Sequence, residues 1–78
     1  MKIIIEDTKY LEDLILQAWS LWKAALSLDL SYRTLNNILK KKTISKWTIL
    51  NKIEKMYILE KEYDPYKNEI KVKIIDYK

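Results

Sequence analysis

The segment from Trp22 to Lys42 constrains the fold more than any other part of the chain, because its helical apolar spacing is interrupted only once. Two short helices that cross over a tight turn need small or apolar residues at such positions. At the interruption, Ser31 can accept a hydrogen bond from a backbone N–H that begins the second helix. The segment therefore predicts a helix, a turn and a second helix. Its inward-facing residues are Ala24, Ala25, Leu28, Leu30, Leu35 and Ile38.

Four features follow one another between Ser20 and Tyr57: Ala25 near the crossing, the turn Asp29-Leu30-Ser31, the pair Thr34-Leu35, and Leu50 with Ile53 three residues later. In this order they resemble the Cro and lambda-repressor-like helix-turn-helix family of small phage and bacterial regulators. That family has an Ala at the crossing, a Gly-Val-Ser turn, an inner Thr-Leu or Thr-Ile, and a further helix with a Leu-x-x-Ile pattern. The resemblance implies a compact helical domain that binds DNA.

The chain departs from this family at the turn, where Asp29 replaces the usual glycine. Asp and Asn are the non-glycine residues that most readily enter the left-handed backbone region, so the turn can still form at some cost in stability. We expect Asp29→Gly to be neutral or stabilising and a β-branched residue to be destabilising.

The N-terminal part predicts a strand over residues 2–6, followed by a helix capped by Asp7 or Thr8. Ser20 offers a cap for the next helix, from about Leu21 to Leu28. No glycine or proline separates the two helices, so one bent helix is the competing prediction. The recognition helix is expected at about 32–41, within a motif that spans about 21–41.

After the motif, a further helix is predicted to begin at Thr43 or Ser45 and to continue to about Glu62, with Asp64-Pro65 ending it. Its apolar face would hold Trp47, Leu50, Ile53 and Tyr57. Residues 69–77 alternate as an edge strand with one lysine-rich face. The predicted fold is one domain over residues 1–78, mainly α, with four or so helices and short terminal strands that could pair with each other or across a twofold axis.

Composition narrows the possible functions. The 78-residue chain has no histidine and no cysteine, which removes the commonest general base, the commonest metal ligand, disulfides and thiolate metal sites. We therefore expect no enzymatic activity and no cofactor. No segment has the length of a signal-peptide core or a membrane span, so a cytoplasmic protein without membrane contact is expected.

The net charge of +4 is unevenly placed along the chain. Residues 1–30 carry a net charge of −2, whereas residues 31–55, which hold seven basic residues and one acid, carry +6. A polyanion would meet the second half of the motif first.

The resemblance places the second helix of the motif in the major groove of double-stranded DNA. Its outward residues Tyr32, Arg33, Asn36 and Asn37 would then contact bases, because Arg can donate two hydrogen bonds to guanine and Asn can exchange a pair with adenine. The residues expected at phosphates are Ser20, Lys23, Ser31, Lys40, Lys41, Lys42 and Lys46. A homodimer on a palindromic operator is expected, and some Cro-like proteins pair through a strand near the C-terminus.

A protein-binding module that keeps the helix-turn-helix scaffold, such as an antirepressor or antitoxin, is the alternative. The three tryptophans, Trp19, Trp22 and Trp47, are expected as core or interface anchors. A contiguous patch of exposed tryptophans would favour a protein partner. RNA binding has less support, because the chain shows neither a glycine-rich clamp nor an aromatic pair typical of RNA-binding sheets.

Overall fold

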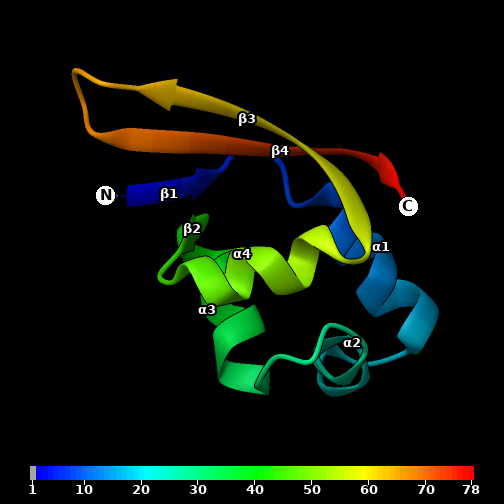
Figure 1. Cartoon of the computed structure of the whole chain (residues 1–78). Coiled ribbons are helices and arrows are strands. Elements are labelled where there is room, and N and C mark those ends of the chain that lie inside the picture. Colours follow the sequence, from blue (N-terminus) through cyan, green and yellow to red (C-terminus); the bar gives the residue numbers. More distant parts are fainter. Residues whose placement is uncertain (1) are drawn as a thin grey trace.

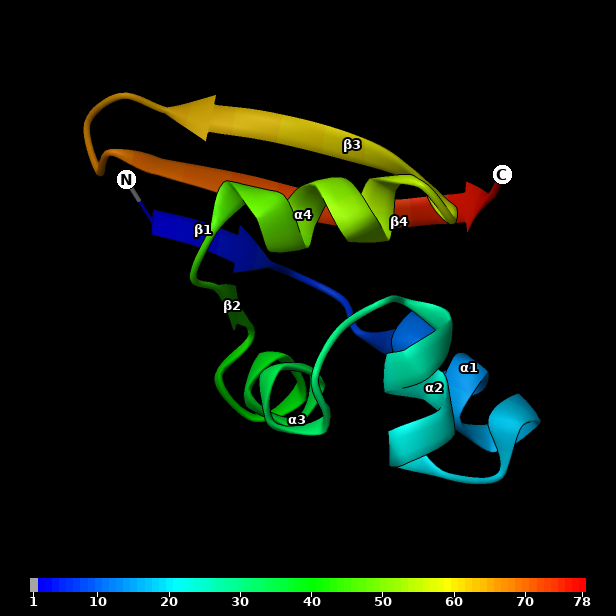
Figure 2. The ribbon, with the colours of Figure 1, turned by 60° about the horizontal axis from the view of Figure 1, so that its bottom comes forward.

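The computed structural model describes residues 2–78, which form four helices and four strands. The elements in chain order are β1 (Lys2–Ile5), α1 (Lys9–Ala18), α2 (Leu21–Ser27), α3 (Tyr32–Lys41), β2 (Thr43–Ile44), α4 (Trp47–Glu54), β3 (Tyr57–Asp64) and β4 (Glu69–Tyr77). The strands form one sheet in the order β2-β1-β4-β3, and the helices lie on one side of it (Figure 1). Seen from a second direction, α1 and α2 form a corner away from the β3–β4 hairpin (Figure 2).

The two ends of the chain pair within the protomer. β1 runs parallel to β4, with Ile3 opposite Ile70 and Ile5 opposite Val72. The short strand β2 adds to the other edge of β1 in antiparallel orientation. The side chains of Ile3, Ile5 and Val72 are buried beneath the helices, so pairing of the terminal strands also closes the core.

The expectation of a mainly α fold is wrong: 45% of the chain is helical and 30% is strand, which makes the fold mixed α/β. The error lies in the last predicted helix. α4 ends at Glu54, and Tyr57–Asp64 is strand β3 rather than helix. Tyr57, predicted on the apolar face of that helix, is instead fully buried at the start of β3. Neither predicted start of this helix is correct, because Thr43 lies in β2 and α4 begins at Trp47 with Lys46, not Ser45, as its N-cap residue.

Long-range pairing explains why the segment after Glu54 leaves the helix. β3 and β4 pair along their whole lengths, which places Glu60 opposite Lys73 and Glu62 opposite Lys71. Opposite charges at directly paired positions stabilise a sheet, typically by ~0.2–1 kcal/mol per pair. A helix that continued to Glu62 would lose both the backbone hydrogen bonds between β3 and β4 and the two pairs of opposite charges. Pairing with a distant strand therefore overrides the helical pattern of the sequence.

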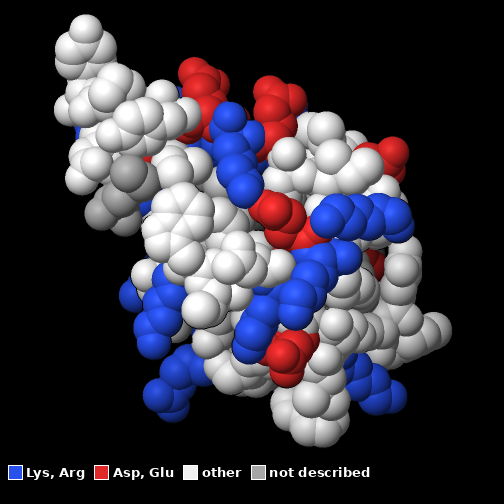
Figure 3. All heavy atoms as spheres, viewed as in Figure 1, with Lys and Arg blue, Asp and Glu red and all other residues white. Residues whose placement is uncertain are grey.

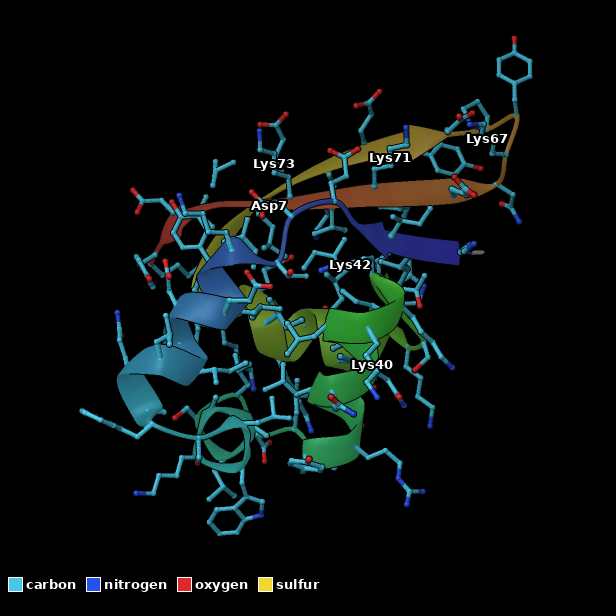
Figure 4. All side chains as sticks on the ribbon, turned by 180° about the vertical axis from the view of Figure 1, so that it is seen from behind. Asp7, Lys40, Lys42, Lys67, Lys71 and Lys73 are labelled. Atoms are coloured by element: carbon cyan, nitrogen blue, oxygen red, sulfur yellow. The ribbon has the colours of Figure 1, made fainter. Side chains whose placement is uncertain are left out.

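β4 forms as predicted over residues 69–77, but it is an interior strand and not an edge. Val72 and Ile74 point into the core, while Lys71 and Lys73 project from the sheet face opposite the helices (Figure 4). The lysines therefore solvate the open face of the sheet. They do not protect a free edge.

The N-terminal helices are two separate elements and not one bent helix. Trp19 ends α1 in the left-handed conformation with a φ of 66°, and Ser20 caps α2 by accepting a hydrogen bond from the Lys23 N–H at 3.0 Å. At the start of α1, Asp7 accepts from the Lys9 N–H at 2.9 Å. The left-handed Trp19 thus stops the first helix and the polar cap Ser20 starts the second, where glycine and proline are absent.

Candidate nucleic-acid interface

The turn between α2 and α3 is built from two backbone hydrogen bonds. The N–H of Leu30 donates to the carbonyl of Ala25 at 2.9 Å, and the N–H of Asp29 donates to the carbonyl of Leu26 at 3.0 Å. This pair of bonds is the Schellman pattern, which requires a left-handed residue after the helix. Asp29 supplies it with a φ of 58°, as expected from its place in the sequence. The bonds fix how α3 leaves α2.

Small and apolar residues hold the two helices together beneath this turn. Ala24 and Ala25 are buried on α2, and Leu35 and Ile38 are buried on α3. Ser31 caps α3 by accepting a hydrogen bond from the Thr34 N–H at 3.1 Å. The predicted bounds, cap and inner face of α3 are confirmed.

The outer side of α3 carries the residues expected to contact bases. The helix spacing puts them in two neighbouring rows, one with Tyr32, Asn36 and Lys40 and one with Arg33, Asn37 and Lys41. All are exposed except Asn36, which is half-buried. Lys40 projects outward from α3 in Figure 4. The structure therefore brings the four base-contact candidates and two of the phosphate candidates onto one exposed helix face.

A small hollow lies beside the second of these rows. It has a volume of about 170 Å³ and is lined by side chains of α3 and of the segment after it, namely Thr34, Asn37, Ile38, Lys41, Thr43, Ser45 and Ile49. Thr43 and Ser45 contribute hydroxyl groups to it, and Ile38 and Ile49 form its apolar floor. Lys46, which follows Ser45 in the chain, is the N-cap residue of α4 and makes no side-chain hydrogen bond to the helix. Backbone and hydroxyl donors close to an exposed lysine can accommodate an anion.

Two other phosphate candidates lie at the start of α2. The Ser20 oxygen is engaged with the Lys23 N–H, and the Lys23 side chain is exposed. In Figure 3, basic side chains form a band across the middle of the face that carries α4, and acidic side chains are prominent along the sheet. The seven basic residues of 31–55 lie on α3 and α4 or directly beside these helices.

Two lysines of this positively charged segment, Lys42 and Lys52, donate hydrogen bonds to other residues of the same chain. The Lys42 ammonium donates to the Thr8 hydroxyl at 2.8 Å, so this expected phosphate contact is turned toward the start of α1 and away from the outer rows of α3 (Figure 4). Lys42 also takes the left-handed position that ends α3, with a φ of 57°. Its backbone conformation directs the chain into β2.

Lys52 is a residue of the motif region that the sequence did not single out. Its ammonium donates to the backbone carbonyl of Asp29 at 2.8 Å and lies 3.5 Å from the Asp29 carboxylate. It therefore ties α4 to the left-handed residue of the turn. Sequence spacing could not have indicated this contact, because the two residues lie in different elements.

The tryptophans do not form the core of the protomer. The side chain of Trp19 is 92% exposed, that of Trp22 58% and that of Trp47 48%. The core expectation is wrong for all three, and their alternative role as interface anchors stays a prediction. An aromatic cluster forms instead around the buried Tyr57, with the partly buried Tyr10 and the exposed Tyr77, and its ring centroids lie 5.1 to 6.1 Å apart.

Comparison of the chain with protein-family profiles, with curated proteins and with solved structures finds no match. Within residues 2–78, no helix has the length and apolar character needed to cross a membrane.

Proposed function

We propose that this protein is a sequence-specific DNA-binding regulator of the helix-turn-helix class, repressor-like and cytoplasmic, acting as a homodimer on a palindromic operator. One observation carries the proposal: α3 has a buried apolar inner side, a defined turn before it, and an outer side that holds Arg33, Asn37 and Lys41 in one row. The resemblance of the motif to Cro and lambda-repressor-like regulators supports the same function.

The chemistry of the outer rows suits the two parts of DNA recognition. The planar guanidinium of Arg33 can donate to O6 and N7 of one guanine, and the amides of Asn36 and Asn37 can each pair with an adenine edge. Lys40 and Lys41 are mobile point charges, which suit phosphates better than base edges. Helix propensity alone would disfavour two adjacent asparagines, so recognition gives a reason for their presence on an exposed face.

Selection of bound duplexes from a random DNA pool tests this proposal, followed by titration of the selected duplex at several salt concentrations. We expect enrichment of a palindrome whose half-sites lie about one helical turn apart. Arg33→Lys keeps the charge but removes the planar fork, so it should lower discrimination at one base pair by roughly 1–3 kcal/mol while leaving the salt dependence unchanged.

Lys40→Ala should instead weaken binding to all sequences and reduce the salt slope by about 1. Lys67→Ala is the matched control, because Lys67 is an exposed lysine in the turn between β3 and β4, in an element separate from α3. If no sequence is enriched, or if Lys67→Ala has the same effect as Lys40→Ala, α3 is not the recognition helix.

The exposed tryptophans favour a second candidate, a protein-binding module such as an antirepressor or antitoxin. Contiguous exposed apolar patches larger than a few hundred Å² are uncommon on monomeric proteins and often mark a contact with another protein. Under this hypothesis the selection yields no motif, binding to DNA stays weak and steeply dependent on salt, and substitution of Arg33 changes nothing.

A further inference from the structure

Four exposed apolar residues lie at the corner formed by α1 and α2. They are Leu16, Trp19, Trp22 and Leu26, which are 74%, 92%, 58% and 59% exposed. Leu16 and Trp19 lie one turn apart at the end of α1, and Trp22 and Leu26 lie one turn apart on α2. Only Ser20 and Leu21 separate the two pairs along the chain. We call these four residues the α1–α2 surface.

Trp19 is costly to the isolated protomer in two ways. A bulky residue in the left-handed region is strained, and nearly the whole indole faces water. Asn or Asp at the same position would satisfy the backbone more easily, as Asp29 and Asn68 do elsewhere in this chain. Burial of the indole against another molecule would offset these two costs and would explain why tryptophan stands at this position.

The same corner is nearly free of charge. Residues 14–32 contain only two charged residues, Lys23 and Asp29, whose charges cancel. In Figure 3, the edge of the molecule at α2 shows few charged side chains. A polyanion gains little from such a surface, and a charged peptide finds no complementary charges there. Two copies of a protein with a net charge of +4 can approach at this corner without strong repulsion.

We propose that the α1–α2 surface is the contact through which two copies of this chain form a symmetric dimer. The two tryptophans and two leucines expose apolar area on the order of 500 Å², since an aromatic side chain alone accounts for about 150–250 Å². A standard interface buries about 800 Å² per partner with an apolar centre and a polar rim. Brought together in one contact, these four residues are large enough for that centre, and the polar side chains around them can supply the rim.

The free edge of β3 is less suited to the same role. Glu60 and Glu62 project from the open face of the sheet, opposite the lysines of β4. In an antiparallel pair, residues directly opposite each other share a face, so the longest overlaps of two β3 strands would bring Glu60 or Glu62 of one copy against an acid of the other. Like charges in such positions destabilise the pairing. The helical corner carries no such penalty.

Sedimentation of the full chain over a concentration series, without DNA, tests the proposal independently of DNA binding. The parent should sediment as a concentration-dependent dimer. Trp19→Asn should weaken the dimer by at least about tenfold, because it removes a large interface side chain. The same substitution should raise the melting temperature of the monomer at high dilution, because Asn tolerates the left-handed backbone better. Opposite effects on dimer and monomer distinguish a lost contact from a damaged fold.

Trp22→Gln is a second variant on the same surface and should also weaken the dimer. Tyr66→Ser is the matched control, because Tyr66 is 99% exposed in the β3–β4 turn and its substitution should leave the dimer unchanged. The proposal is overturned if the parent is monomeric at ~0.1 mM, a concentration well above the usual dissociation constants of standard interfaces. It is also overturned if the dimer survives both tryptophan substitutions, or if Tyr66→Ser weakens it equally.

Discussion

Substitution of Asp29 tests the turn that orients α3. The residue has a φ of 58°, and its own N–H and that of Leu30 close the two hydrogen bonds of the turn. A β-branched side chain in this region costs about 1–3 kcal/mol. Asp29→Val also removes the exposed ion pair with Lys52, which is worth at most about 1 kcal/mol. The backbone carbonyl of residue 29 can still accept from Lys52, so the expected loss stays close to the strain itself.

Two matched variants separate these contributions. Asp29→Asn keeps a side chain that tolerates the left-handed region and removes only the charge, so its free energy of unfolding should fall by less than about 1 kcal/mol. Asp29→Gly relieves the strain but loses the ion pair and adds freedom to the unfolded chain, so the net change should be near zero or slightly stabilising.

Urea denaturation followed by far-ultraviolet circular dichroism gives the free energies, and thermal melts give an independent check. In a domain of this size, 1 kcal/mol corresponds to a shift of roughly 4–8 °C in Tm. We expect the order Gly, Asp, Asn, Val from most to least stable, with Val clearly separated. A melt of Asp29→Val that coincides with that of the parent would refute the assigned strain at this turn.

The remaining predictions concern single contacts. Burial raises the pKa of Tyr57 to about 12 from its ordinary 10.0. The stability that this tyrosine contributes is therefore complete below pH 10 and should be lost as the pH rises toward about 12. Tyr57→Phe should abolish this alkaline loss. At neutral pH Tyr57→Phe should be neutral or stabilising in urea melts, because the Tyr57 hydroxyl has no hydrogen-bond partner among residues 2–78. The hydrogen bond and the positive charge of Lys61 lower the pKa of the Glu54 carboxyl below its ordinary 4.5. Lys61→Met should therefore reduce stability at neutral pH, and this reduction should shrink as the pH falls below 4.5. Lys42→Met should lower the melting temperature without reducing the salt slope of DNA binding, since its ammonium is bonded to Thr8.

Local signals in the sequence predicted the helical motif well. Ser20 and Ser31 form the caps expected of them, Asp29 adopts the left-handed conformation, and α3 begins and ends at the predicted residues. These features depend on contacts between residues at most five apart in the chain, such as the bond from Leu30 to Ala25. Short-range hydrogen bonds and helical spacing are properties that a sequence displays directly.

Features that depend on distant partners were predicted less well. The segment after Glu54 has apolar residues at helical spacing, yet it pairs as β3 with a strand that follows it. Tryptophan is a large apolar residue of the kind expected in a core, but Leu11, Leu50 and Tyr57 fill the core of this protein instead. Lys42 and Lys52 belong to a basic segment, and their actual partners, Thr8 and Asp29, lie in other elements.

Residues close together in the chain were enough to specify the stop, the turn and the restart of the helix-turn-helix, and the residues of α3 that face outward. Helical periodicity and capping act within a few residues, so no knowledge of the rest of the chain is needed. Contacts between distant segments, in contrast, set residues 57–64 in a strand, placed β4 inside the sheet, and left Trp19 and Trp22 exposed. Those outcomes follow from which distant segments compete for one small core and one sheet, and that competition is settled by packing rather than by local preference.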